Sequence, residues 1–136
     1  MGRAIKTLTQ ADIIVINHWM IRRFGGVFFS HDNNLANPGS LDHVLEAIEG
    51  SLFGQELYPT LFEKGAAIAW RIIKGHVFHD GNKRTGMEAC RNFFDLNGYI
   101  LKMDNQTIDV AVDIASNKME FPDFVAWIEG RIESKP

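Results

Sequence analysis

Hydrophobic residues at helical spacing constrain the fold of this chain more than any other feature of its sequence. Thr9 and Asp12 have the spacing of a helix N-cap box, apolar residues then recur every three or four positions, and glycines at 25–26 stop the helix. Five more helices are expected, at residues 40–50, 59–75, 82–97, 106–116 and 122–132. Residues 99–103 are the only strand-like segment, too short and solitary for a sheet core. The sequence therefore predicts an all-α bundle.

Composition excludes several classes of protein. The 136 residues, 46% of them hydrophobic, fit one core, so we expect a single domain over residues 1–136. Fourteen Lys and Arg against 17 Asp and Glu leave no basic excess for direct nucleic-acid binding. The one cysteine, Cys90, excludes a disulfide framework and a multi-cysteine zinc site. Neither a membrane span nor a secretory signal is visible, so we expect a soluble, cytoplasmic protein with no membrane partner.

The segment that carries chemistry is HVFHDGNKRTG, residues 76–86, a loop that runs into the start of a helix. Such a start presents unpaired backbone N–H groups and the positive end of the helix dipole. Its first turn nevertheless carries Lys83 and Arg84, and each misplaced cation costs on the order of 0.3–1 kcal/mol. A bound anion restores the balance. We therefore expect a phosphate chain against the amides of residues 82–84, with both cations around it.

The other residues of this segment complement a bound polyphosphate. Asp80 can hold Mg²⁺, and Gly81 lets the backbone turn and approach a ligand closely. Asn82 can cap the helix or donate its side-chain amide to a phosphate oxygen. His76 can accept a proton from an attacking hydroxyl, and Phe78 is expected to anchor the loop in the core. Singly, each residue has an ordinary structural explanation; together they favour a functional site.

This segment resembles the signature of the Fic/Doc family, and its Asn-Lys-Arg form is closest to the Doc (death-on-curing) toxin branch. The stretches RFGG at 23–26, NPGSL at 37–41 and YPTLFEK at 58–64 also resemble Doc-type segments, in the expected order. The resemblance covers about residues 8–105. It implies a Fic fold, a helical bundle with a short β-like flap, whose active loop and following helix bind ATP and Mg²⁺.

The resemblance also implies residue roles. His76 matches the catalytic base, Asp80 the magnesium-binding acid and Phe78 the loop anchor. The positions that match nucleotide-binding or phosphate-binding residues of the family are Gly81, Asn82, Lys83 and Arg84. Two departures lie in or near the loop. Val77 replaces a common proline, and residues 27–36 look like an insertion whose Phe28-Phe29 pair either docks the target or, as we favour, extends the core.

Fic enzymes transfer AMP from ATP to a protein hydroxyl, whereas Doc-type members transfer the terminal phosphate to a translation elongation factor. Lys83 stands where the AMP-transferring form typically has glycine, and it would crowd one phosphate subsite. We therefore expect phosphate transfer to a Ser or Thr hydroxyl, with AMP transfer as the alternative. The inhibitory helix of many Fic enzymes has no intact match, because Val125 precedes Glu129-Gly130 where Ser or Thr belongs. An antitoxin acting in trans is therefore expected.

Two rival functions compete with this interpretation. His79-Asp80 is an adjacent HD doublet, and His43 and Asp113 would complete the metal site of a phosphohydrolase. A turn and a helix start follow Asp80, however, where that site needs an apolar helix. A binding module without catalysis is the second rival, and the intact set of polar residues in the motif argues against it.

Overall fold

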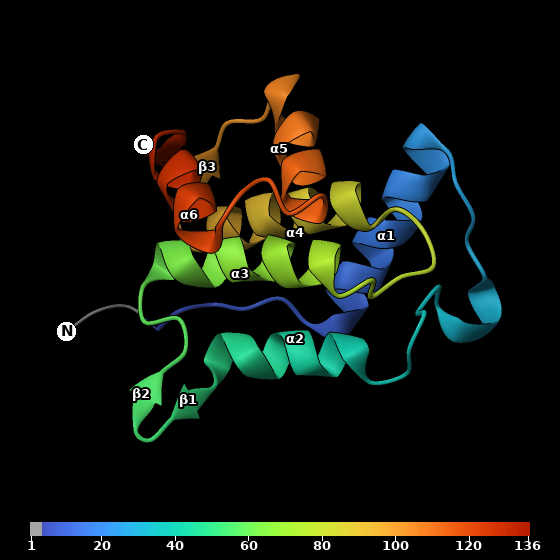
Figure 1. The fold of residues 1–136 in the computed structure, drawn as a ribbon, viewed down its shortest axis with the longest axis horizontal. Helices are drawn as coiled ribbons and strands as arrows, with labels where there is room; N and C mark the ends of the chain where they lie inside the picture. The colour runs from blue at the N-terminus through green and yellow to red at the C-terminus, as the bar shows by residue number, and fades with distance from the viewer. Residues whose placement is uncertain (1–3) are drawn as a thin grey trace.

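A computed structural model describes residues 4–136 of the chain, and helices dominate it (Figure 1). The helices within this range are α1 (Gln10–Phe24), α2 (Ser40–Glu49), α3 (Leu61–Lys74), α4 (Asn82–Leu96), α5 (Gln106–Ala115) and α6 (Phe121–Glu129), with one 3₁₀ turn, η1 (Ser30–Asp32). The predicted all-α bundle is confirmed. No helix among the described residues is long and apolar enough to cross a membrane.

Helices α3 and α4 form the centre of the bundle and make its most extensive helix–helix contact. In Figure 1, α3 runs across the middle, with α2 below it, α5 and α6 above it and α4 behind it. Phe78, Phe93, Phe94 and Phe124 are among the largest fully buried side chains of the core. Cys90 is also buried there, and burial raises the pKa of its thiol, so it is a core residue and no nucleophile.

The helix starts follow from local capping. The hydroxyl of Thr9 accepts a hydrogen bond from the Asp12 backbone N–H at 3.2 Å, and the Asp12 carboxylate accepts one from the Thr9 N–H at 2.8 Å. This is the N-cap box that the sequence predicts. Thr60 caps α3 by accepting from the backbone N–H of Glu63, so the helix begins after Thr60, two residues later than expected.

Two small antiparallel sheets correct the prediction of a solitary strand. Strands β1 (Ser51–Leu52) and β2 (Gln55–Glu56) form a hairpin, and β3 (Tyr99–Leu101) pairs with β4 (Ile132–Ser134). Helix α6 ends at Glu129, so Ile132 lies opposite Leu101 in a strand rather than in the sixth helix. Periodicity could not reveal this pairing, because the two strands are far apart in the sequence.

Gly65 permits the close approach of α3 and α4. A Cβ atom at this position would stand 2.6 Å from Cε2 of the buried Phe94 ring, well inside van der Waals contact. We expect Gly65→Ala to lower the free energy of unfolding by about 1–3 kcal/mol, because overpacking outweighs the gain of about 1 kcal/mol in helix propensity. Chemical denaturation measures this difference.

Gly130→Ala is the matched control for this prediction. A Cβ atom at Gly130, at the end of α6, would come no closer than 3.6 Å to its neighbours. The control should stay within about 0.5 kcal/mol of the parent protein. Equal stability of the two variants would contradict the account of α3–α4 packing.

Candidate active site

The loop between α3 and α4 is paired along its length with the segment that follows α1. Leu35 and Phe78 form an antiparallel bridge, the Ala36 N–H donates to the Val77 carbonyl, and the His79 N–H donates to the Asn34 carbonyl, both at 2.9 Å. Residues 27–36 therefore support the loop from outside. The prediction that Phe28-Phe29 extends the core is wrong: Phe28 stacks on His18, and Phe29 is 45% exposed.

A buried amide network fixes the loop from the inside. The side-chain amide of Asn17, on α1, donates to the Asp80 carbonyl at 2.9 Å and to the Thr85 hydroxyl at 3.0 Å. Its oxygen accepts from the side-chain amide of Asn34 at 2.9 Å. Asn17, Asn34 and Thr85 are all 0% exposed. One side chain thus connects α1, the supporting segment, the loop and the first turns of α4.

Asn82 and Phe78 shape the loop at its centre. The Asn82 side chain accepts from the Phe78 N–H at 2.9 Å and donates to the Phe78 carbonyl at 2.8 Å. The N-cap residue of α4 is Gly81, with φ at 78°, so Asn82 is not the helix cap. A Cβ atom at Gly81 would stand 3.1 Å from Ile21, in addition to the backbone strain. Phe78 is 1% exposed and holds the loop in the core.

The Asp80 carboxylate is exposed but oriented by two backbone N–H groups. Oδ1 accepts from Gly81 at 2.8 Å, and Oδ2 accepts from Val27 at 3.0 Å. Gly26 is needed beside it, because a Cβ atom there would lie 2.8 Å from Oδ2. Carboxylate oxygens have lone pairs beyond one hydrogen bond each. This exposed, oriented pair of hard oxygens fits Mg²⁺, which takes carboxylate, phosphate and water ligands.

His76 has an unusual backbone conformation for a residue with a side chain. Its φ is 46°, in the left-handed region, directly after the Gly75 that ends α3. The side chain is exposed and has no hydrogen-bond partner among residues 4–136. A left-handed conformation costs an L-residue roughly 1–2 kcal/mol, and such strain concentrates at functional sites. The imidazole is therefore held at the surface, where a substrate can reach it.

The start of α4 is as electropositive as the sequence predicts. Its first turn contains no acidic residue, and neither Lys83 nor Arg84 forms an ion pair with any described residue. The guanidinium of Arg84 lies 3.9 Å above the centre of the Phe24 ring, which is 49% exposed. Arg84 and Phe24 also line a cavity of about 350 Å³ between α1, α4 and the start of α5. An anion can therefore be met by two cations and by backbone N–H groups.

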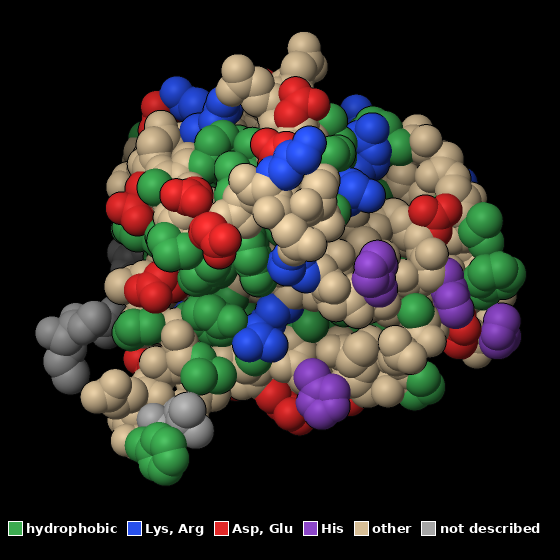
Figure 2. Space-filling model, viewed as in Figure 1, with side chains coloured by type: hydrophobic (Ala, Val, Ile, Leu, Met, Phe, Trp, Pro, Cys, Tyr) green, Lys and Arg blue, Asp and Glu red, His purple; other side chains and the backbone are tan. Residues whose placement is uncertain are grey.

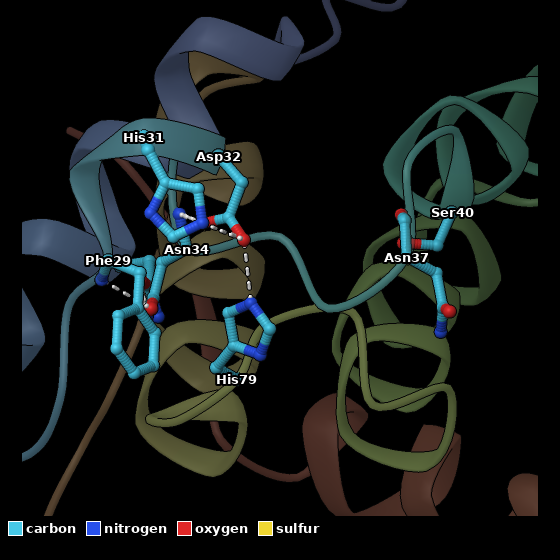
Figure 3. A network of polar contacts seen from close by, with 8 residues as sticks. Phe29, His31, Asp32, Asn34, Asn37, Ser40 and His79 are labelled. Carbon is cyan, nitrogen blue, oxygen red and sulfur yellow. Dashed lines mark hydrogen bonds and ion pairs between the residues drawn. The ribbon is translucent and has the colours of Figure 1, made fainter.

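The side chain of His79 contacts the segment after α1 and is not part of a cluster of metal ligands among the described residues. Its Nε2 atom lies 2.8 Å from Oδ2 of Asp32, and its ring meets Phe29 edge-on (Figure 3). The hydrogen bond from His79 lowers the pKa of Asp32 below its ordinary value. Among the described residues no three His, Cys, Asp or Glu side chains gather around a possible metal position. His43 and Asp113 lie on α2 and α5, so the HD-type constellation is not assembled.

Sequence reasoning missed the two buried asparagines that organise the site. Asn17 is a polar residue on the apolar face of α1, between Ile13 and Ile21. This break in the hydrophobic pattern was the only sign in the sequence that Asn17 has a structural role. Asn34 carried no signal in a loop rich in polar residues. These two residues fix the backbone of the loop between His76 and the start of α4, because they bond to its Asp80 carbonyl and its His79 N–H.

Asn17→Ala tests this network. The substitution leaves the Asn34 amide, the Asp80 carbonyl and the Thr85 hydroxyl without their partner, so we expect the free energy of unfolding to fall by about 2–4 kcal/mol. Amide exchange should also accelerate at His79, whose N–H bonds to the Asn34 carbonyl. Denaturation and hydrogen-exchange NMR measure the two effects.

Asn92→Ala provides the control, because its side chain bonds only to Glu88, one turn away on the same helix. We expect this variant to lose less than about 1 kcal/mol and to leave exchange at His79 unchanged. If the two variants behave alike, the network does not support the loop.

Comparison with known proteins agrees with this geometry. A family model described as the Fic/DOC family matches residues 7–94. The chain is 27% identical over 109 residues to "Toxin Doc" of Mycolicibacterium smegmatis. The aligned region covers 78% of this chain and 84% of that relative. It is also 23% identical over 115 residues to "Protein kinase doc" of Escherichia phage P1, and this alignment covers 85% of the chain and 86% of the relative. The chain belongs to the Fic/DOC family.

Proposed function

We propose that this protein is a Doc-like toxin of the cytoplasm that transfers the γ-phosphate of ATP to a Ser or Thr hydroxyl of another protein. The observation that carries the proposal is the start of α4, where Lys83 and Arg84 have no acidic partner among the described residues. It lies in the same loop region as an exposed base, His76, and an oriented carboxylate, Asp80. Two relatives named as a toxin and as a protein kinase support this choice.

In the proposed reaction, the phosphates lie over the first turn of α4, and the Asp80 carboxylate would hold Mg²⁺. Bound Mg²⁺ supplies positive charge that neutralises the phosphate oxygens. His76 accepts the proton of the attacking hydroxyl. The bond from the hydroxyl oxygen to the γ-phosphorus forms as the bond to the β-phosphate oxygen breaks, and ADP leaves. Lys83 and Arg84 stabilise the negative charge that spreads over the phosphoryl oxygens.

Lys83 favours phosphate transfer over AMP transfer. Its long, exposed side chain stands in the first turn of α4 without an acidic partner among the described residues. We expect it to crowd one phosphate subsite and so to favour a different nucleotide pose. Transfer of AMP is the alternative reaction within the same family. For the acceptor we propose a translation elongation factor. Position 125 on α6, four residues before Glu129, carries Val where the inhibitory motif has Ser or Thr. We therefore also propose a separate antitoxin as the inhibitor.

Labelled ATP distinguishes the two reactions, and His76 variants test the base. We expect cell-extract protein to acquire label from γ-³²P ATP and none from α-³²P ATP. His76→Ala should reduce labelling by about 10²–10⁴-fold, and expression of this variant should relieve the growth arrest that the parent chain causes. Label from the α position alone would support AMP transfer, and no label from either would support a binding module.

His76→Gly separates loss of the base from loss of structure. Glycine tolerates the φ of 46°, so this variant should be more stable than His76→Ala by about 1 kcal/mol while remaining equally inactive. His31→Ala, which removes another exposed histidine, should retain full activity. Activity in His76→Gly equal to that of the parent protein would exclude His76 as the base.

A further inference from the structure

A second concave surface lies beside the loop between α3 and α4, and neither Lys83 nor Arg84 lines it. It is a cleft of about 430 Å³, within the range of sites that bind ligands. Its lining comes from α2, from α3 and from the loop residues on either side of His76, namely Gly75 and Val77. None of its lining residues lines the cavity that contains Arg84. A group bound in this cleft would thus lie beside the backbone on both sides of His76 and outside the cavity that contains Arg84.

The cleft is positively charged in a protein of net charge −3. Arg71, Lys74 and His43 line it, and no Asp or Glu does so. Neither Arg71 nor Lys74 forms an ion pair with a described residue, and the nearest carboxylate to His43 is that of the exposed Glu46, at 3.7 Å. Figure 2 shows Lys and Arg side chains over α3 near the middle of this face, with His side chains beside them.

Arg71 is oriented for binding by an aromatic neighbour. Its Nε donates to the Tyr58 hydroxyl at 2.9 Å, and its guanidinium lies 5.5 Å above the centre of the same ring. The outer N–H groups of the fork have no partner among residues 4–136 and match the geometry of a carboxylate. Lys74 lies over the Trp70 ring and donates to Ile114 and Asn117 at the end of α5. Both cations are therefore held in place before a ligand arrives.

We propose that this cleft binds an acidic segment of the protein substrate and so brings the acceptor hydroxyl to His76. Two cations without an acidic partner favour an anionic ligand, and the Tyr58 and Trp70 rings offer apolar surface to the rest of a peptide chain. A carboxylate-bearing peptide meets both requirements. This inference rests on the proposed function, because a docking cleft beside His76 has meaning only if His76 acts on a protein.

The test uses a fluorescein-labelled octapeptide of alternating Glu and Gly, with a Lys-Gly octapeptide as the charge control. We expect the acidic peptide to bind at 50 mM NaCl, to weaken at 300 mM NaCl, and to shift the indole N–H signal of Trp70 while those of Trp19 and Trp127 stay in place. Arg71→Gln/Lys74→Gln should weaken binding at least about tenfold, the scale of one charge-assisted hydrogen bond. Arg71→Gln alone, which keeps the contacts of Lys74 with α5, should weaken it by several-fold.

Lys6→Gln/Arg22→Gln removes two exposed positive charges elsewhere and should change the affinity less than about twofold. Equal binding by all variants, no binding by the parent protein, or complete displacement by an equimolar amount of inorganic phosphate would overturn the docking proposal. ATP affinity, measured on the same samples, should be the same in the Arg71 variants and the parent. A parent protein that binds the peptide but not ATP would instead refute the proposed function.

Discussion

The whole site depends on the buried side-chain amide of Asn17. It bonds at once to the loop carbonyl of Asp80, to Thr85 on α4 and to Asn34 in the segment after α1. A buried amide without partners would cost more than its hydrogen bonds contribute, so this arrangement is stable only when every partner is present. The described residues contain no buried side-chain polar atom without a hydrogen bond. The loop consequently has one well-defined path between α3 and α4.

That path places residues against their local preferences. His76 takes a left-handed conformation, and cations stand at the positive end of the α4 dipole. Both features cost stability, and the tight contact of α3 with α4 and the amide network compensate for them. The result is an exposed imidazole, an oriented carboxylate and an electropositive helix start along one segment of the chain. These are the groups that phosphoryl transfer requires.

The sequence was sufficient for the helices and for the loop that carries the candidate site residues, because both are encoded locally. Capping at Thr9, the proline early in α6 and the cations after Gly81 are signals within a few residues of the features they predict. The missing parts are contacts between distant segments. The pairing of β3 with β4 and the bridge between Leu35 and Phe78 correspond to no periodic pattern of residues in the sequence. The expected capping role of Asn82 also differs from the structure, where its side chain instead forms two hydrogen bonds with the backbone of Phe78 in the loop.

The central claim is that a polyphosphate binds at the start of α4. Titration of the ¹⁵N-labelled protein with ATP and Mg²⁺, followed by NMR, tests it most directly. The account predicts saturable shifts that are largest at the backbone amides of residues 82–84. Saturable shifts centred on another part of the molecule, or no shift at millimolar ATP, would contradict it.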